Sequence, residues 1–146
     1  MQILVQPLDR LDPRTAYGMW RLRQDVFVVE QDCAYPDLDG RDLEAATRHV
    51  VILDDDRVVA TARVLDDGVE QRIGRVVCHP DVRGTGASGD LMRAAVDAAT
   101  RAAPDQDVVL GAQSPLVGFY GRFGFVVDGP EYLEDDIRHT PMRLRR

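Results

Sequence analysis

The 146-residue chain contains no lysine, so its 18 basic residues are all arginines. This absence excludes the phosphate-binding loop of ATPases and GTPases, because that loop ends in Gly-Lys-Ser/Thr. Cysteine is also scarce: Cys33 and Cys78 are the only two, and their spacing matches no metal site. We therefore expect two reduced thiols rather than a disulfide, and no bound metal.

Long apolar segments are missing as well. No run approaches the ~20 residues needed to span a bilayer, and the first residues lack the basic start and apolar stretch of a signal peptide. These absences predict a cytoplasmic protein with no membrane partner. The net charge of −7 argues against nucleic acid as a partner, because phosphate backbones attract clustered basic residues. The same charge leaves room for a cationic substrate.

The length and the apolar content of 45% predict one globular domain over residues 1–146. Apolar periodicity and turn residues give the order of its elements. We expect strand 1–7, a helix from Asp12-Pro13, strands 48–53, 57–65 and 72–78, a helix through 91–102, strand 107–112, a short helix capped by Ser114, and strands 124–127 and 138–144. This order predicts an α+β fold with a mixed sheet rather than a regular βαβ repeat.

The segment 30–44, between the first helix and the strand meander, contains six acidic residues and one arginine. Such a composition is typical of a solvated loop, and we expect most of these carboxylates to face water. Loops also carry function more often than strands do.

The stretch from Arg72 to Met92 predicts a strand, a glycine-rich turn and the start of a helix. The first backbone N–H groups of a helix have no internal partner, and the helix dipole adds partial positive charge there. Glycines let a phosphate approach the backbone, and Arg83 adds a fixed charge. The stretch therefore predicts a ligand that carries phosphate.

Two kinds of phosphate ligand fit this turn. Residues 84–89 match the G-x-G-x-x-G pattern of dinucleotide-binding proteins, but that pattern belongs near the first strand and here it lies in the middle of the chain. The residues from His79 to Gly86 follow an apolar strand and resemble the acetyl-CoA-binding motif Q/R-x-x-G-x-G/A of the GNAT acetyltransferases. Ser88 departs from that motif, in which Gly or Ala is usual.

Further motifs strengthen the resemblance to the GNAT family. Residues 118–125 are similar to its later FY..FGF motif, and residues 22–31, 35–42, 47–49, 73–76 and 111–113 resemble the ElaA-like branch. The resemblance implies the GNAT acyl-CoA N-acyltransferase fold, a central mixed, mostly antiparallel sheet flanked by helices. It also implies acetyl-CoA as the acetyl donor. Its contacts are expected at Val76, Val77, Cys78, Arg83, Gly84, Thr85, Gly86, Ala87, Ser88 and Gly89.

Acetyl transfer to an amine also needs an acid for the leaving thiolate and a base for the amine. Tyr120 is the candidate acid, since a phenol is protonated at neutral pH, although it lies on a helical face with core residues. Glu30 ends an apolar run, and partial desolvation would strengthen it as the base. His49, Arg75 and His139 are candidate substrate-binding residues, and the two histidines are alternative bases.

The sequence thus predicts an acetyl-CoA-dependent N-acetyltransferase that acts directly on a primary amine of a small-molecule or peptide acceptor, as a monomer or homodimer. One alternative is a module of the same fold that binds acyl-CoA without catalysis. The other is a nucleotide-binding domain that uses the G-x-G-x-x-G match.

Overall fold

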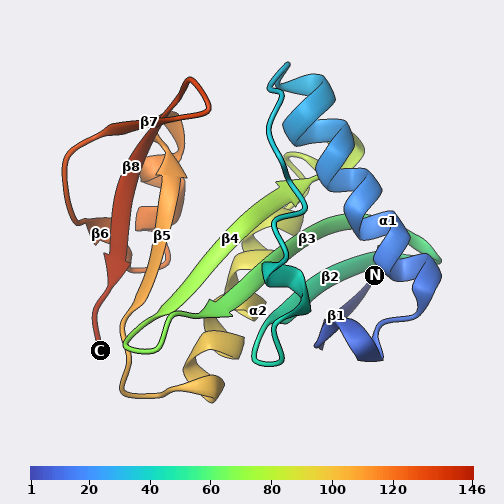
Figure 1. Ribbon diagram of the computed structural model, residues 1–146, viewed down its shortest axis with the longest axis horizontal. Coiled ribbons are helices and arrows are strands. Elements are labelled where there is room, and N and C mark those ends of the chain that lie inside the picture. The colour runs from blue at the N-terminus through green and yellow to red at the C-terminus, as the bar shows by residue number, and fades with distance from the viewer.

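A mixed sheet with helices on both faces forms the centre of the computed structural model, which describes residues 1–146 (Figure 1). The main elements are β1 (Gln2–Gln6), α1 (Pro13–Arg23), β2 (Arg48–Asp54), β3 (Arg57–Asp66), β4 (Gln71–Cys78), α2 (Ala87–Ala102), β5 (Val108–Gln113), α3 (Val117–Gly121), β6 (Val126–Val127), β7 (Tyr132–Glu134) and β8 (Ile137–Leu144). The strands lie in the order β1-β2-β3-β4-β5-β8-β6, and β7 pairs with β8. Only β4 and β5 are parallel. The predicted α+β class is confirmed.

The first helix begins where the sequence predicts. Asp12 is the N-cap of α1, its Oδ1 accepts a hydrogen bond from the Arg14 N–H at 2.8 Å, and Pro13 occupies the first turn. After Arg23 the chain does not leave the helix but widens into a π-helix over Gln24–Glu30. Backbone bonds from Gln31 to Val26 and from Cys33 to Val28 span five residues. Such segments are rare and occur frequently at functional sites.

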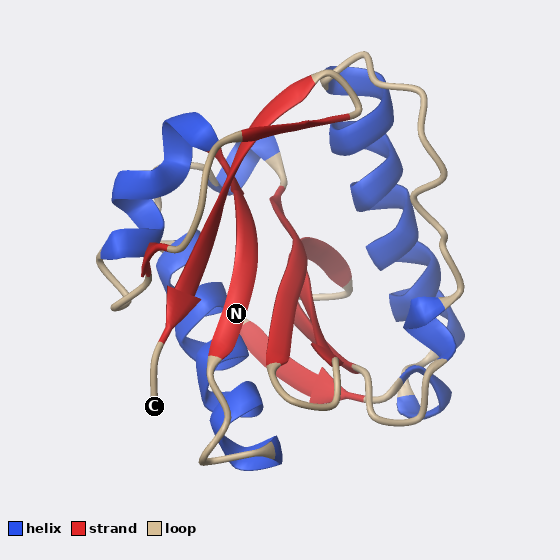
Figure 2. Ribbon diagram, turned by 60° about the vertical axis from the view of Figure 1, so that its left-hand side comes forward, coloured by secondary structure: helices blue, strands red, loops and turns tan.

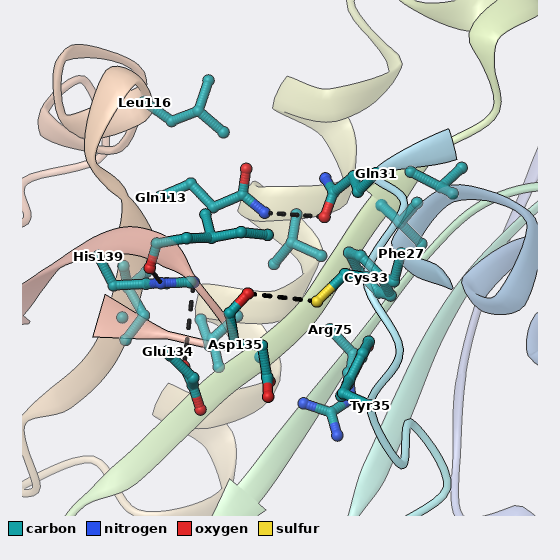
Figure 3. Close-up of a pocket in the computed structure, with 18 of the residues that line it drawn as sticks. Phe27, Gln31, Cys33, Tyr35, Arg75, Gln113, Leu116, Glu134, Asp135 and His139 are labelled. Carbon is teal, nitrogen blue, oxygen red and sulfur yellow. Dashed lines mark hydrogen bonds and ion pairs between the residues drawn. The ribbon is translucent and has the colours of Figure 1, made fainter. Parts of the chain in front are cut away.

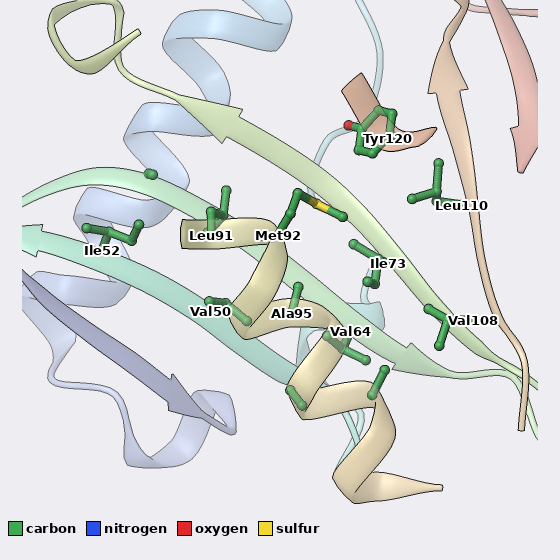
Figure 4. Packing of buried hydrophobic residues seen from close by; sticks show 14 of the residues in the cluster. Val50, Ile52, Val64, Ile73, Leu91, Met92, Ala95, Val108, Leu110 and Tyr120 are labelled. Atoms are coloured by element: carbon green, nitrogen blue, oxygen red, sulfur yellow. The ribbon is translucent and has the colours of Figure 1, made fainter. Parts of the chain in front are cut away.

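Both faces of the central strands are covered by helices, as Figure 2 shows. Residues of β2 and β3 such as Val50 and Ala62 pack with Leu91 and Met92 of α2 in the larger core (Figure 4). Alternate residues such as Val51 and Val58 pack against α1 in a second core. Strand β3 is buried along its whole interior because each face meets a helix. Its alternation is broken once: Ala60, Ala62 and Val64 belong to the larger core, whereas Val58, beyond a shift in the pairing with β2, belongs to the second core.

Two features near the C-terminus differ from the expectation. Ser114 does not cap the following helix; its hydroxyl instead pairs with the Thr140 hydroxyl at 2.9 Å on β8. Strand β7 was missed, because three exposed residues carry no apolar pattern. It turns into β8 through Asp135 and Asp136, both with positive φ, as a tight hairpin turn requires.

No helix in the structure combines the length and the apolar character required to cross a membrane.

Candidate active site

The two parallel strands of the sheet separate soon after they meet. Their pairing is confined to Gln71 with Val108 and Arg72 with Val109, and beyond these residues β4 and β5 diverge (Figure 1). A cavity of about 810 Å³ opens between them. Its walls come from β4, β5, the π-helix, α3 and the β7–β8 hairpin. Past Arg72, the β5-facing side of β4 has no strand beside it, so its main-chain groups face this cleft.

A bulge in β4 sets the direction of Arg75. Thr61 pairs with Val77 and Arg63 pairs with Gly74, so Arg75 and Val76 together oppose the single residue between them on β3. Arg75 has a φ of 50°, as the extra residue of a bulge can have. Its guanidinium reaches Asp37, with Nε 2.9 Å from Oδ1 and Nη2 donating to the carbonyl at 3.0 Å. Arg75, a candidate substrate-binding residue, lines the cleft, and its guanidinium is paired with the acidic loop.

The glycine-rich turn lies at one end of the cleft and leads into α2. Gly84 and Gly86 have φ values of 79° and 91°, a region that favours glycine. Gly86 is the N-cap of α2, and no side chain caps the helix. Ala87 is buried in the larger core, which fixes the helix start against the sheet. The first turn of α2 therefore presents backbone N–H groups that no side chain satisfies, as an anion site requires.

Glu30, the expected base, and Arg83, an expected donor-binding residue, form an ion pair in the structure. Arg83 donates to both carboxylate oxygens of Glu30, at 2.9 and 3.1 Å, and its Nε donates to the Cys78 carbonyl at 3.3 Å. The Glu30 and Arg83 side chains are each 44% exposed. Glu30 lines the cleft, but it is neither desolvated nor unpaired, which are the conditions that would strengthen it as a base.

Tyr120 of α3 lines the cleft and is 7% exposed. Burial, with a smaller contribution from the nearby Cys78, raises its pKa to about 12. Tyr35 differs, because its hydroxyl donates to Asp37 Oδ1 at 2.5 Å and is therefore engaged. The Tyr120 hydroxyl thus remains protonated at neutral pH and is available to donate a proton into the cleft.

Four of the six acidic residues of the acidic loop are exposed, as its composition predicts, but Asp37 and Asp42 are buried. Asp42 is 4% exposed and accepts from Arg23 Nη1 at 2.8 Å and from Arg63 Nη1 at 3.2 Å. Asp37 accepts from Arg23 Nε at 2.8 Å, and Arg23 itself is 1% exposed. The expectation was wrong for these carboxylates because their partners come from distant elements, α1 and β3. The resulting network holds the loop, and Tyr35 within it, as one wall of the cleft.

His49 was expected to contact the substrate, and the structure does not bring it to the cleft. Its ring on β2 is completely buried beneath the acidic loop, with Nε2 3.2 Å from the Asp42 carbonyl. Burial lowers its pKa. We correct this expectation, since a side chain without exposed surface can neither bind an acceptor nor exchange protons with it. His49 instead supports the loop from below.

His139 on β8 does line the cleft, as expected. Its ring stacks on Tyr132 with centroids 5.6 Å apart and lies beside Glu134 (Figure 3). Both neighbours come from β7, the strand that the sequence reading missed. The tyrosine rests on β5 at Gly111, where any Cβ would collide with its hydroxyl. The paired aspartates Asp135-Asp136 were the available sequence signal for this hairpin.

Two hydrogen bonds cross the cleft above β4. Gln113 Nε2 donates to Gln31 Oε1 at 3.3 Å, and Cys33 Sγ donates to the Asp135 carbonyl at 3.3 Å (Figure 3). They join the end of the π-helix to β5 and to the hairpin turn. Cys33 and Cys78 are free thiols, and no group of three or more His, Cys, Asp and Glu side chains is placed to hold a metal ion.

Comparison with known proteins agrees with this geometry. The model of the acetyltransferase (GNAT) domain matches residues 24–146. A UPF0039 protein of Mycobacterium tuberculosis is 44% identical over 137 residues, which cover 90% of this chain and 85% of the relative. The protein ElaA of Escherichia coli is 43% identical over 129 residues, 86% of this chain and 84% of the relative.

Solved structures show the same similarity. A crystal structure described as an acyl-CoA N-acyltransferase from Pseudomonas aeruginosa superposes with a TM-score of 0.93 at 39% identity, covering all of both chains. The crystal structure of Escherichia coli ElaA superposes with a TM-score of 0.94 at 37% identity, again over the whole of both chains.

Proposed function

This chain belongs to the GNAT acetyltransferase family, in the branch that includes ElaA, and from this premise we propose that it transfers an acetyl group from acetyl-CoA directly to a primary amine. The observation that carries the proposal is the cleft between β4 and β5. Tyr120 lines this cleft and is suited to donate a proton. Arg83 also lines it and leads through the glycine-rich turn to the uncapped start of α2, which is suited to anchor a phosphate. The acceptor is a small molecule or a peptide.

The donor would be held by main-chain groups along two adjoining stretches. The pyrophosphate would meet the residues from Arg83 to Gly89, where positive-φ glycines expose the backbone. The pantetheine arm would follow Val76, Val77 and Cys78, on the side of β4 that β5 has left. A backbone N–H of this strand would stabilise the negative charge that develops on the thioester oxygen.

In the reaction, the amine nitrogen forms a bond to the carbonyl carbon of the thioester, and the carbon–sulfur bond breaks. The sulfur leaves as a thiolate and takes the proton of the Tyr120 hydroxyl. An ammonium acceptor loses two protons overall: one goes to solvent, and the other restores Tyr120. The products are an amide, CoA with a free thiol and one proton. Holding both reactants in the cleft supplies a further part of the rate.

Direct transfer is preferred over a covalent enzyme intermediate because of the state of the two cysteines. Both line the cleft, but burial raises the pKa of each thiol, and neighbouring aspartates raise that of Cys33 further. The thiolate is the nucleophilic form of cysteine. Neither residue is therefore suited to accept the acetyl group.

A thermal shift measurement with acetyl-CoA, CoA, NAD and ATP tests the donor. A ligand that binds only the folded protein raises the melting temperature by mass action. We expect acetyl-CoA and CoA to raise it and NAD and ATP to leave it unchanged. A shift with NAD alone would instead favour a dinucleotide site. Amine-dependent release of CoA thiol then separates an enzyme from a module that only binds acyl-CoA.

Arg83→Gln is expected to weaken acetyl-CoA binding about tenfold, because a charged hydrogen bond contributes roughly 1.5 kcal/mol. The measurement is the dissociation constant by calorimetry. Arg101→Gln is the matched control, since it removes the same charge from the far end of α2, where the side chain is 81% exposed. Equal dissociation constants for the two variants would show that Arg83 does not contact the donor.

A further inference from the structure

The surroundings of His139 single out one nitrogen of its ring. Nδ1 lies 2.8 Å from the Ile137 carbonyl oxygen, which can only accept a hydrogen bond. Nδ1 must therefore carry the hydrogen, and in the neutral ring Nε2 has the free lone pair. The bond lies within the β7–β8 hairpin, so the backbone itself fixes the tautomer.

Glu134 lies next to the nitrogen with the lone pair. Its Oε2 is 3.9 Å from Nε2, and the carboxylate is 59% exposed at the cleft edge. The carboxylate therefore lies at ion-pair distance from the nitrogen that would receive a proton. The His139 side chain is 12% exposed and is stacked on Tyr132, so its ring orientation is fixed. These are the features of a positioned base: a set tautomer, a fixed ring and a counter-ion for the charged form.

We propose that His139 is the general base that removes a proton from the acceptor amine at Nε2, with Glu134 as the positioning residue that stabilises the imidazolium. The proposal rests on the acetyl transfer proposed above and adds the group that activates the acceptor. It replaces Glu30 in that role. Glu30 is bound at both oxygens by Arg83, whereas Nε2 of His139 has no partner closer than Glu134.

The other groups around the ring do not compete for this role. Gln113, which pairs with His139 across β5 and β8, carries no charge. Gln31 and Cys33 lie across the cleft, and Asp135 engages Cys33 through its carbonyl (Figure 3). The nearest cation in sequence, Arg138, is paired with Glu131 at 3.4 Å on the exposed side of the hairpin. Glu134 is the carboxylate within ion-pair distance of the ring.

The proton balance of the step is simple. An acceptor that enters as an ammonium ion gives one proton to Nε2, and the nitrogen lone pair that remains attacks the thioester carbonyl. His139 then holds two N–H groups, one bonded to the Ile137 carbonyl and one facing Glu134. It returns the extra proton to solvent through the open mouth of the cleft before the next turnover.

NMR of the imidazole nitrogens tests the geometry without any acceptor. With His139 assigned by comparison with His139→Gln, we expect the Nδ1–H tautomer at high pH. Glu134→Gln and its matched control Glu131→Gln should both keep this tautomer, because the Ile137 carbonyl sets it. An Nε2–H tautomer would overturn the proposal.

The pH dependence of turnover tests the role. Rates are measured with saturating acetyl-CoA and a panel of ethanolamine, putrescine, glucosamine and a short peptide with a free N-terminus. We expect His139→Gln to lose the acidic limb of the pH–rate profile and to slow turnover about 100-fold, a typical contribution of a general base. Glu134→Gln should slow turnover and Glu134→Asp should restore part of it, whereas Glu131→Gln should leave turnover unchanged.

The outcomes separate this proposal from the one on which it rests. A wild-type protein that acetylates none of the four amines overturns both. Wild-type turnover with an unchanged acidic limb in His139→Gln overturns only the role of His139. Loss of the limb in Glu30→Gln, with His139→Gln unchanged, returns the role to Glu30.

Discussion

Tyr120→Phe is expected to lower the turnover number about 100-fold or more while acetyl-CoA binds as tightly as before. The substitution removes one oxygen from a ring that is otherwise held by packing, including an edge-to-face contact with Phe119 at 5.1 Å. The cleft and the start of α2 therefore stay intact. Without the phenol, the thiolate must take its proton from water, and a positioned general acid typically contributes 10²- to 10⁴-fold.

The measurement is steady-state kinetics with thiol detection, together with the dissociation constant of acetyl-CoA. Tyr17→Phe is the control, because it removes the same hydroxyl at a position outside the cleft. Tyr17 lies on α1 and is 69% exposed. Turnover equal to that of the wild type would remove Tyr120 from the acid role and leave it as a core residue. A large loss of acetyl-CoA affinity would instead show that its hydroxyl holds the donor.

Asp42→Asn is expected to lower the free energy of unfolding by about 3 kcal/mol or more. The change leaves two buried arginines, Arg23 at 1% exposure and Arg63, with an uncharged partner. Removing one charge of a buried ion pair typically costs 3–5 kcal/mol, because the other charge stays buried without its partner. We expect a melting temperature lower by roughly 10 °C for a chain of this length. Chemical denaturation with urea measures the free energy directly.

The control for this prediction is Asp25→Asn. Asp25 at the start of the π-helix forms an ion pair with Arg21 of α1 on the protein surface. The Asp25 side chain is 53% exposed and the Arg21 side chain is 72% exposed. Exposed pairs contribute little, so we expect a change below about 1 kcal/mol. Similar small changes in both variants would mean that Asp42 is solvated like most carboxylates of the acidic loop.

The loss of stability in Asp42→Asn should also depend on pH. Burial alone would raise the pKa of Asp42, but the hydrogen bonds and charges of Arg23 and Arg63 outweigh it, so its pKa is lowered in the folded state. A lowered pKa stabilises the fold above the unfolded value of about 4, and this stabilisation is lost as the pH falls through the folded value. The difference between the wild type and the variant should therefore be full at pH 7 and shrink in strong acid.

Local features of this chain could be predicted because their causes lie within a few residues. Asp12 and Pro13 carry the cap and the first-turn proline of α1 in consecutive positions. Gly84 and Gly86 precede an amphipathic helix, and both adopt the positive φ that such a turn uses. The family motifs likewise need no knowledge of distant partners, so the place of the glycine-rich turn and the order of the elements, β7 excepted, followed from the sequence.

Burial and pairing could not be predicted in the same way. The carboxylates Asp37 and Asp42 are buried because Arg23 and Arg63 reach them from α1 and β3, and composition alone cannot show such partners. His49 and His139 look alike in the sequence. His49 lies beneath the acidic loop, whereas His139 faces the cleft. The difference arises because successive side chains of a strand point to opposite faces of the sheet, and what covers each face depends on the tertiary structure.

Local motifs and periodicity suffice to assign the family and the fold class and to locate the glycine-rich turn. Which strands separate, which carboxylates are paired and which histidine meets the cleft depends on contacts between segments far apart in the chain. Hydrogen bonds, desolvation and charge act through space, so a local pattern does not reveal them. Residues such as Glu134 and His139, or Glu30 and Arg83, acquire their chemistry from neighbours that folding brings to within 4 Å.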